Sequence, residues 1–465
     1  ADAVAVTHLA QTNAANAEGG IALSSDSADI DLTGTASIAG HGSISISAGR
    51  DLLLNAQVQH AGTAATDSIS LSAARDLVIN QAINGAGMGS VTLSTTAGDI
   101  DLNANLLSGG GAVVLSAGAH VDMDAAVKIA TSTTVTGEDG SVAITAADDI
   151  LLSLIETDGQ VNLTATNGAI LSQLTSGALN INAASSRLYL TASAGVGAAP
   201  VIDVSSHAVT TPAKALVTRV ASLSAQNTTS GGIYLNEQDD LIVSALESSV
   251  VGIDSAGSAG DVVLTLTTGN LTVNNAISTS GASGHVLVKT LSGNMSIETA
   301  VTSGEGSVSL DASGSLSLTA GGRVTAIGGG AQSIDLWARG GAITMANGAK
   351  LNTNSSNNGN VRLQAATNVV LGRITAGTGA VSVQADSGSI TLASGLTPPA
   401  ISAGALRLEA TAGIGLSTAA LSTKVDSLAL SNSGTGGVFV SESDGVTVAD
   451  VAAVTVKRVS TDGVA

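Results

Sequence analysis

The chain has 465 residues and a net charge of −20, with only 16 Lys and Arg residues, which are scattered along the sequence. This charge argues against a nucleic acid or an anionic membrane surface as partner, because both attract clustered cations. Aromatic residues make up 1% of the chain and cysteine is absent, while 44% of the residues are hydrophobic. We therefore expect a narrow interior of uniform width, filled by small aliphatic side chains.

A phrase of three short strands appears first at residues 43–59, SISISAGRDLLLNAQVQ. Apolar and polar residues alternate within each run, which predicts β-strands with one face buried. Small and polar residues separate the runs and predict sharp corners. The phrase returns at residues 68–84 as SISLSAARDLVINQAIN. Strands this short bury little surface alone, so we expect successive copies to stack.

The pattern continues along most of the chain, with units about 22 residues long. The first strands are predicted at Ile44/Ile46, Ile69/Leu71, Val91/Leu93, Val113/Leu115, Val142/Ile144 and Val161/Leu163, and again from Val262/Leu264 to Val381/Val383. The third strands are predicted at Val58, Ile83, Leu106, Val127 and Ile155. Corners carry Gly, Asn, Ser or Asp, as at TTGN, LSGN and DASGS. The prediction is an all-β fold, a β-solenoid of the right-handed parallel β-helix type with three-strand coils.

The sequence also repeats with a second, longer period that spans many coils. Residues 223–243 match residues 428–448 at an offset of 205, and the segments at 174 and 188 match those at 392 and 406 at an offset of 218. We predict two blocks, 1–216 and 217–421, and the start of a third, 422–465, in one continuous rod. At about 4.8 Å per coil, roughly 21 coils would extend about 100 Å.

Neither end of the sequence resembles a capping element. A finite solenoid normally covers its terminal coils, because open ends expose sheet edges. We expect either a slice of a longer array, cut or processed from it, or a unit that stacks end to end.

Stacking would align polar residues into columns on the outside. Asp99, Asp101, Asp122 and Asp124 would form an acidic cluster across two adjacent coils. Ca²⁺ accepts such oxygen ligands, so this cluster is a candidate metal site, with a solvated acidic face as the alternative. Elsewhere Asn55, Asn80 and Asn103 predict an amide ladder along the axis, and Arg50 and Arg75 predict ion pairs with the neighbouring aspartates. No other cofactor is expected.

Three aromatic residues are candidate contact points. Tyr234, Trp337 and Phe439 each fall between inward apolar residues, and Tyr234 and Phe439 occupy the same place in successive blocks. They are expected to face outward, either toward a neighbour or beneath a local loop. The six histidines are dispersed, and no spacing suggests a nucleophile–base pair or a metal site built on histidine. We expect no enzymatic activity.

The phrase at Gly42–Ala56, and nearly at Gly89–Ala104, follows the pattern G-S-φ-x-φ-x-A-x-x-D-φ-x-φ-x-A, where φ is apolar. It resembles the repeats of filamentous-haemagglutinin-like giant exoproteins, a resemblance that covers most of the chain. Similar units occur in contact-dependent inhibition proteins and in large autotransporter adhesins. The resemblance implies a β-helical shaft, secretion through the outer membrane by a dedicated partner, and a role in adhesion or cell-surface structure.

These observations predict the structural shaft of an extracellular bacterial adhesin or surface filament. Two alternatives stay open: a discrete subunit that polymerises end to end into a fibre, and the stalk of a contact-dependent toxin delivery protein. The expected partners are other copies of the chain, end to end or laterally, and a host or neighbouring cell surface. No transmembrane segment is expected, because no run of 18 apolar residues occurs.

Overall fold

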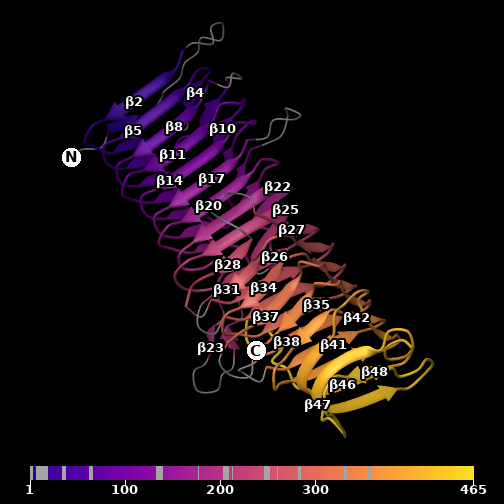
Figure 1. Ribbon diagram of the computed structural model, residues 1–465. Helices are drawn as coiled ribbons and strands as arrows, with labels where there is room; N and C mark the ends of the chain where they lie inside the picture. The colour runs from indigo at the N-terminus through magenta and orange to yellow at the C-terminus, as the bar shows by residue number, and fades with distance from the viewer. Residues whose placement is uncertain are drawn as a thin grey trace. The chain divides into compact units, whose positions relative to one another are not determined.

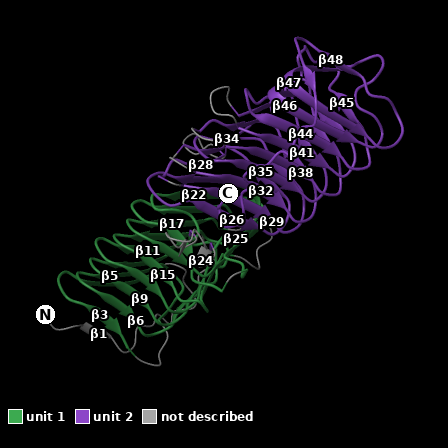
Figure 2. Cartoon of the chain, turned by 90° about the horizontal axis from the view of Figure 1, so that it is seen from below, with its two compact units in different colours: residues 1–198, 214–222 green, residues 199–213, 223–465 purple. Residues whose placement is uncertain are grey.

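The structure is a computed structural model in which every regular element is a β-strand (Figure 1). It describes residues 4–6, 19–33, 38–61, 66–131, 140–175, 177–199, 201–202, 209–211, 213–245, 252–258, 260–280, 284–328, 332–353 and 359–465. The contacts divide the chain into two compact units (Figure 2), residues 1–198 with 214–222 and residues 199–213 with 223–465. The predicted blocks 1–216, 217–421 and 422–465 describe repetition in the sequence, and their boundaries stay a prediction.

In unit 1 the chain winds through three parallel sheets, one strand of each per coil. The first sheet contains β2 (Ile21–Ser25), β5 (Ile44–Ala48), β8 (Ile69–Ala73), β11 (Val91–Thr95), β14 (Val113–Ala117), β17 (Val142–Ala146), β20 (Val161–Ala165) and part of β22 (Ile181–Ala192). The second contains β1 (Val4–Val6), β3 (Ile30–Leu32), β6 (Leu52–Leu54), β9 (Leu77–Ile79), β12 (Ile100–Leu102), β15 (Val121–Met123), β18 (Ile150–Leu152) and β21 (Ile170–Ser172). The third contains β4 (Ile38–Gly40), β7 (Val58–His60), β10 (Ile83–Gly85), β13 (Leu106–Leu107), β16 (Lys128–Ala130), β19 (Leu154–Glu156) and the start of β22.

Unit 2 repeats this arrangement. Its first sheet contains β26 (Ile233–Glu237), β29 (Val262–Leu266), β32 (Val286–Thr290), β35 (Val308–Ala312), β38 (Ile334–Ala338), β41 (Val361–Ala365) and β44 (Ala380–Ala385). The second contains β27 (Leu241–Val243), β30 (Leu271–Val273), β33 (Met295–Ile297), β36 (Leu316–Leu318), β39 (Ile343–Met345), β42 (Val369–Leu371) and β45 (Ile390–Leu392). The third contains β28 (Ile253–Ser255), β31 (Ile277–Thr279), β34 (Ala300–Ser303), β37 (Arg323–Ala326), β40 (Lys350–Asn352) and β43 (Arg373–Thr375).

The remaining strands depart from this scheme. The long strands β46 (Ile401–Ala410) and β47 (Leu421–Asn432) pair in parallel, and β48 (Val440–Glu442) and β49 (Thr447–Val448) pair with β47. Strand β25 (Leu216–Asn227) contains residues of both units. The strands β23 (Val201–Ile202) and β24 (Val209–Thr211) form an antiparallel pair.

Register between coils is set by the apolar residues. Ile44 pairs with Ile69 and Ile46 with Leu71, and both members of each pair are at most 1% exposed. A slip of one residue would turn every inward side chain outward, so burial fixes the register. The predicted all-β, right-handed parallel β-solenoid is confirmed, and its interior consists of aliphatic columns as the composition indicated.

One predicted strand position is wrong. Val127 was expected in the third-strand column, but Ile129 pairs there with Leu106 and Ile155. A turn at residues 125–126, closed by the Val127 N–H donating to the Asp124 carbonyl at 2.9 Å, delays β16 by two residues. Since the shift is even, Val127 stays on the inward face and is also buried.

Glycine at the predicted corners allows the coils to approach. Gly293, in the LSGN corner between β32 and β33, has φ +103°, and a Cβ there would lie 1.9 Å from the carbonyl oxygen of Gly269 in the preceding coil. Both the backbone angle and the contact therefore require glycine. Gly445, after β48, has nothing within 4 Å of an added Cβ.

We expect Gly293→Ala to destabilise unit 2 by more than about 1 kcal/mol, because alanine brings both backbone strain and a backbone clash. The urea midpoint followed by the fluorescence of Trp337, the single tryptophan, would measure the effect. Gly445→Ala is the matched control and should leave the midpoint unchanged. Equal midpoints for the two variants would contradict this account of the corner.

Candidate functional site

A column of acidic residues, which includes Asp99 of the predicted cluster, lies at the corner before the second sheet of unit 1 and bonds each coil to the next. An Oδ1 atom of Asp51 accepts from the Asp76 N–H at 3.2 Å, Asp76 accepts from the Asp99 N–H at 3.2 Å, and Asp99 accepts from the His120 N–H at 2.9 Å. Asp149 continues the column by accepting from the Ala169 N–H. These carboxylates therefore satisfy corner amides, which is a structural role.

The other members of the proposed calcium cluster lie together. Asp101 and Asp122 are paired across β12 and β15, and with Asp124 they line a depression of about 460 Å³. Gln173 closes it by donating Nε2 to Asp122 Oδ1 at 2.8 Å. Burial, and then the charges of Asp99 and Asp122, raise the pKa of Asp101. The carboxylates of the site thus repel one another. One oxygen of Asp99 already accepts a hydrogen bond from the backbone N–H of His120.

Calcium binding at this cluster stays a prediction. Among the described residues, no group of three or more His, Asp or Glu side chains is arranged so that it could hold a metal ion. A cation would have to draw Asp101, Asp122 and Asp124 closer than they lie here.

The predicted amide ladder is present. Asn80 donates Nδ2 to Asn55 Oδ1 at 2.8 Å, Asn103 donates to Asn80 at 2.9 Å, and Asn55 donates to Asp31. Asn55 and Asn80 each donate to the preceding coil and accept from the following one, so one amide type can continue the column from coil to coil.

The predicted ion pairs are also present, each reaching back by one coil. Arg50 binds Asp29, and Arg75 binds Asp51. The hydrogen bond from Arg50 lowers the pKa of Asp29 to about 2.

Tyr234, one aromatic candidate, is covered rather than exposed. Its side chain is 2% exposed and its ring lies over Gly232, where a Cβ would be 2.9 Å from Cε2. Its hydroxyl donates to Asp261 Oδ2 at 3.1 Å, and the other oxygen of Asp261 accepts from the His285 N–H. Burial raises the pKa of Asp261 to about 6, and burial together with the Asp261 charge raises the pKa of Tyr234.

Trp337 contacts two guanidinium groups. The Arg339 Cζ atom is 3.5 Å from the ring centroid and that of Arg458 is 4.2 Å away. Arg458 also donates to Asp335 at 2.6 Å, and Arg339 donates to Asp311 at 2.6 Å. The half-buried indole therefore makes two cation–π contacts, and the ion pairs hold both arginines in place.

Arg458 belongs to residues 450–465, here called the strap, which run back across successive coils of unit 2. In Figures 1 and 2 the C-terminus lies far from β48, toward the other end of this unit. Backbone atoms of the strap bond side chains of progressively earlier coils: Arg407 to Val451, Asn360 to Thr455, Ser333 to Lys457 and Ser309 to Val459. Near its end, an added Cβ on Gly463 would be 2.5 Å from Asp261 Oδ2. The strap thus covers part of the flank of unit 2.

Phe439 differs from its counterpart Tyr234. Its ring lies over Gly437, as that of Tyr234 lies over Gly232, but the side chain is 39% exposed. Of the three aromatic candidates, Phe439 is the most exposed.

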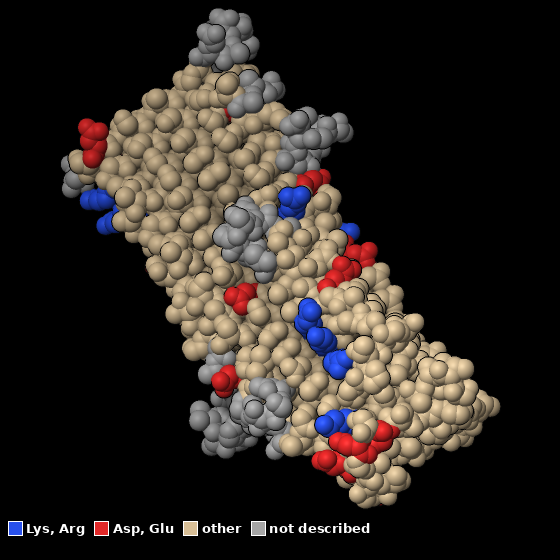
Figure 3. Space-filling model, viewed as in Figure 1, with Lys and Arg blue, Asp and Glu red and all other residues tan. Residues whose placement is uncertain are grey.

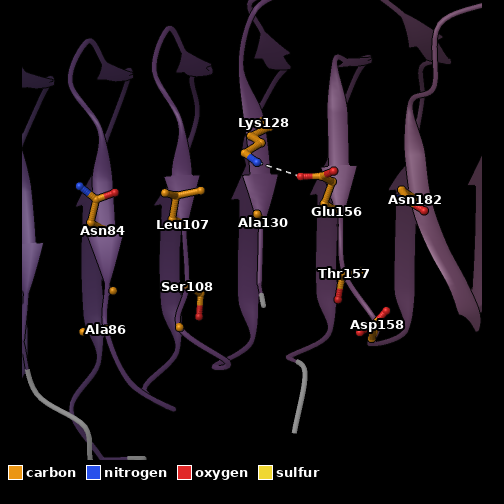
Figure 4. Close-up of a pocket in the computed structure, with 12 residues that line it drawn as sticks. Asn84, Ala86, Leu107, Ser108, Lys128, Ala130, Glu156, Thr157, Asp158 and Asn182 are labelled. Carbon is orange, nitrogen blue, oxygen red and sulfur yellow. Dashed lines mark hydrogen bonds and ion pairs between the residues drawn. The ribbon is translucent and has the colours of Figure 1, made fainter. Parts of the chain in front are cut away.

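A depression of about 670 Å³ lies on the third sheet of unit 1 and crosses β10, β13, β16, β19 and β22 (Figure 4). Lys128 Nζ and Glu156 Oε2 are 2.9 Å apart within it. The hydroxyls of Ser108 and Thr157 donate to the carbonyl oxygens of Gly111 and Gly140. Both hydroxyl protons are therefore engaged with the backbone.

Sequence reasoning missed a column of three cations on the third sheet of unit 2. Arg323 pairs with Lys350, and Lys350 pairs with Arg373, at the start of β37, β40 and β43. These residues are 27 and 23 positions apart, so they appear scattered in the chain. Aligning third strands as well as first strands could have found them. In Figure 3 a short row of Lys and Arg side chains is visible on one face of the molecule, with Asp and Glu side chains beyond its ends.

Comparison of the chain with protein-family models, curated proteins and solved structures finds no match. The described residues include no helix long and apolar enough to cross a membrane.

If the acidic cluster binds calcium, calorimetry should detect a heat of binding that disappears in the double variant Asp99→Asn/Asp101→Asn, because two carboxylates are removed. Magnesium at the same concentration controls for screening of the acidic surface. Identical heats in the parent and the double variant would remove the calcium hypothesis.

We expect Asp261 to make stability fall with rising pH. Its pKa of about 6 in the folded chain exceeds the ordinary aspartate value, so the folded state holds the proton more tightly than the unfolded state. This contribution is complete below about pH 4 and is lost as pH rises through 6. Asp261→Asn should remove this decrease in the free energy of unfolding, which amounts to about 3 kcal/mol at most.

Urea unfolding at intervals from pH 4 to 8, followed by Trp337 fluorescence, would measure this slope. Asp386→Asn, which removes an exposed carboxylate bonded to Gln384, is the control and should retain the parental slope. A parental slope in Asp261→Asn as well would show that another group is responsible.

Proposed function

We propose that this chain is a non-enzymatic structural shaft of an extracellular bacterial adhesin or surface filament, acting as a long rigid spacer. The observation that carries the proposal is the in-register stacking of coils within each unit. Each coil binds the next through three parallel strand pairings. A structure of this kind grows in length by addition of coils without a change in cross-section.

The surface chemistry supports the same role. Asparagine amides and corner carboxylates are used to bond coil to coil. The two hydroxyls in the depression on the third sheet of unit 1 bond to backbone carbonyl oxygens. Polar groups of unit 1 thus serve the stacking itself, and the resemblance of the repeated phrase to filamentous-haemagglutinin-like exoproteins points to a location at the bacterial cell surface.

A discrete subunit that polymerises end to end is the second candidate. The observation in its favour is the last coil of unit 2, where Leu430, Val438 and Val448 are 37%, 43% and 76% exposed. Apolar side chains at such a sheet end would be buried by a further coil. The stalk of a contact-dependent toxin delivery protein is a third candidate, because the same shaft would serve it.

The experiment that separates these candidates is the mass of the native protein under fully denaturing conditions. We expect a species of hundreds of kilodaltons, in which these residues form part of a covalent shaft. A species near the 44.8 kDa of this chain would favour the discrete subunit. Protease treatment of intact cells tests the location, since a protein that is cleaved only after lysis would contradict a surface role.

A further inference from the structure

The cation column Arg323, Lys350 and Arg373 places three positive charges on consecutive coils. Neighbouring strands in a sheet lie about 4.8 Å apart, so the column repeats at this interval along the axis of unit 2. The residue after each cation, Val324, Leu351 or Ile374, is at most 1% exposed. The cations therefore project from the outer face, where Arg323 and Lys350 are exposed.

The column has no carboxylate partner in the part of the chain that the structure describes. Arg323 donates to the Gly321 carbonyl oxygen, and Arg373 donates to the carbonyl oxygens of Thr397 and Pro399. These oxygens carry no net charge, so the three cations repel one another uncompensated. In a chain of net charge −20, where other arginines bind aspartates of adjacent coils, such an arrangement favours an external anion.

A second column beside the cations adds neutral hydrogen-bonding groups at the same interval. Two positions after each cation stand Thr325, Asn352 and Thr375, and the register carries this column on to Thr302 and Ser402. Residues two apart in a strand share a face. The outer face thus presents a row of charge and a parallel row of hydroxyl and amide groups.

We propose that these two columns bind a linear carboxylated polysaccharide that lies along the axis of unit 2. The cations would attract carboxylates of such a chain, and the hydroxyl and amide groups beside them would bond sugar hydroxyls. A single-stranded nucleic acid fits less well, since these columns contain no aromatic side chain on which a base could stack. This assignment goes beyond the proposed structural role and does not depend on it.

The test uses hexagalacturonate as the probe and the full chain as the protein. Titration by calorimetry at low salt should detect binding that weakens as salt is added. Lys350→Gln should raise the Kd about fivefold, the factor for one unit-charge contact in water. The dependence of log Kd on log salt should become shallower by on the order of one unit, as a single cation is lost.

Lys424→Gln is the matched control. Lys424 is an exposed lysine of β47 whose Nζ lies 3.7 Å from Asp444, so its loss changes the net charge equally without touching the column. We expect its Kd to equal that of the parent. Lys350→Arg should retain binding, and unchanged circular dichroism and Trp337 fluorescence would show that each variant is folded.

Three results would overturn the proposal. The first is an equal loss of affinity in Lys350→Gln and Lys424→Gln. Binding would then depend on the electrostatic field of the whole protein and not on the cation column. The second is equal binding of fully methyl-esterified hexagalacturonate, which has the same chain without the charge. The third is tighter binding of a single-stranded DNA hexamer with the same dependence on Lys350, which would assign the column to a nucleic acid. None of these results bears on the shaft, which the denatured mass tests separately.

Discussion

Hydrogen bonding between successive coils is the interaction on which the rest of this structure depends. The strands are mostly three to five residues long, and none could be stable alone. Each becomes stable because its backbone pairs with the coil before and the coil after, while its inward side chains extend a common aliphatic column. The register that results is strict, since a slip by one residue would expose the whole column.

Stacking has a chemical consequence, because any residue type that recurs at one position becomes a ladder. Amides are suited to this, as the column from Asn55 to Asn103 shows, because each carries both a donor and an acceptor. Aspartates at the corners also stabilise the stack, because each accepts a hydrogen bond from a backbone N–H of the next coil. A cationic side chain donates hydrogen bonds but cannot accept them. Stacked cations such as Arg323, Lys350 and Arg373 therefore repel one another unless an anion lies beside them.

The strap shows how a segment outside the repeat changes the surface that the repeat predicts. It bonds side chains of several coils through its backbone, and its Arg458 covers Trp337. Tyr234 and Phe439 are equivalent in the sequence, yet one is buried beside Asp261 and the other is half-exposed. Their different surroundings, rather than their local sequences, decide which of them a partner could reach.

The sequence by itself determined the fold class, the strand positions, the glycine corners and the amide ladder of this protein. All of these follow from a period of two within strands and a recurring phrase between them, which are local patterns. The exception within the repeat, Ile129 in place of Val127, arises from a turn that adds two residues without breaking the alternation.

Only the tertiary structure decided which outward residues are covered and which charges meet. The sequence places Arg323, Lys350 and Arg373 more than 20 positions apart, and it places Arg458 more than 100 positions from Asp335. The alternation of apolar and polar residues predicts whether a side chain points inward or outward. It does not predict which other segment covers an outward side chain. The path of the strap, and the exact length of each coil, bring these distant charges within reach of one another.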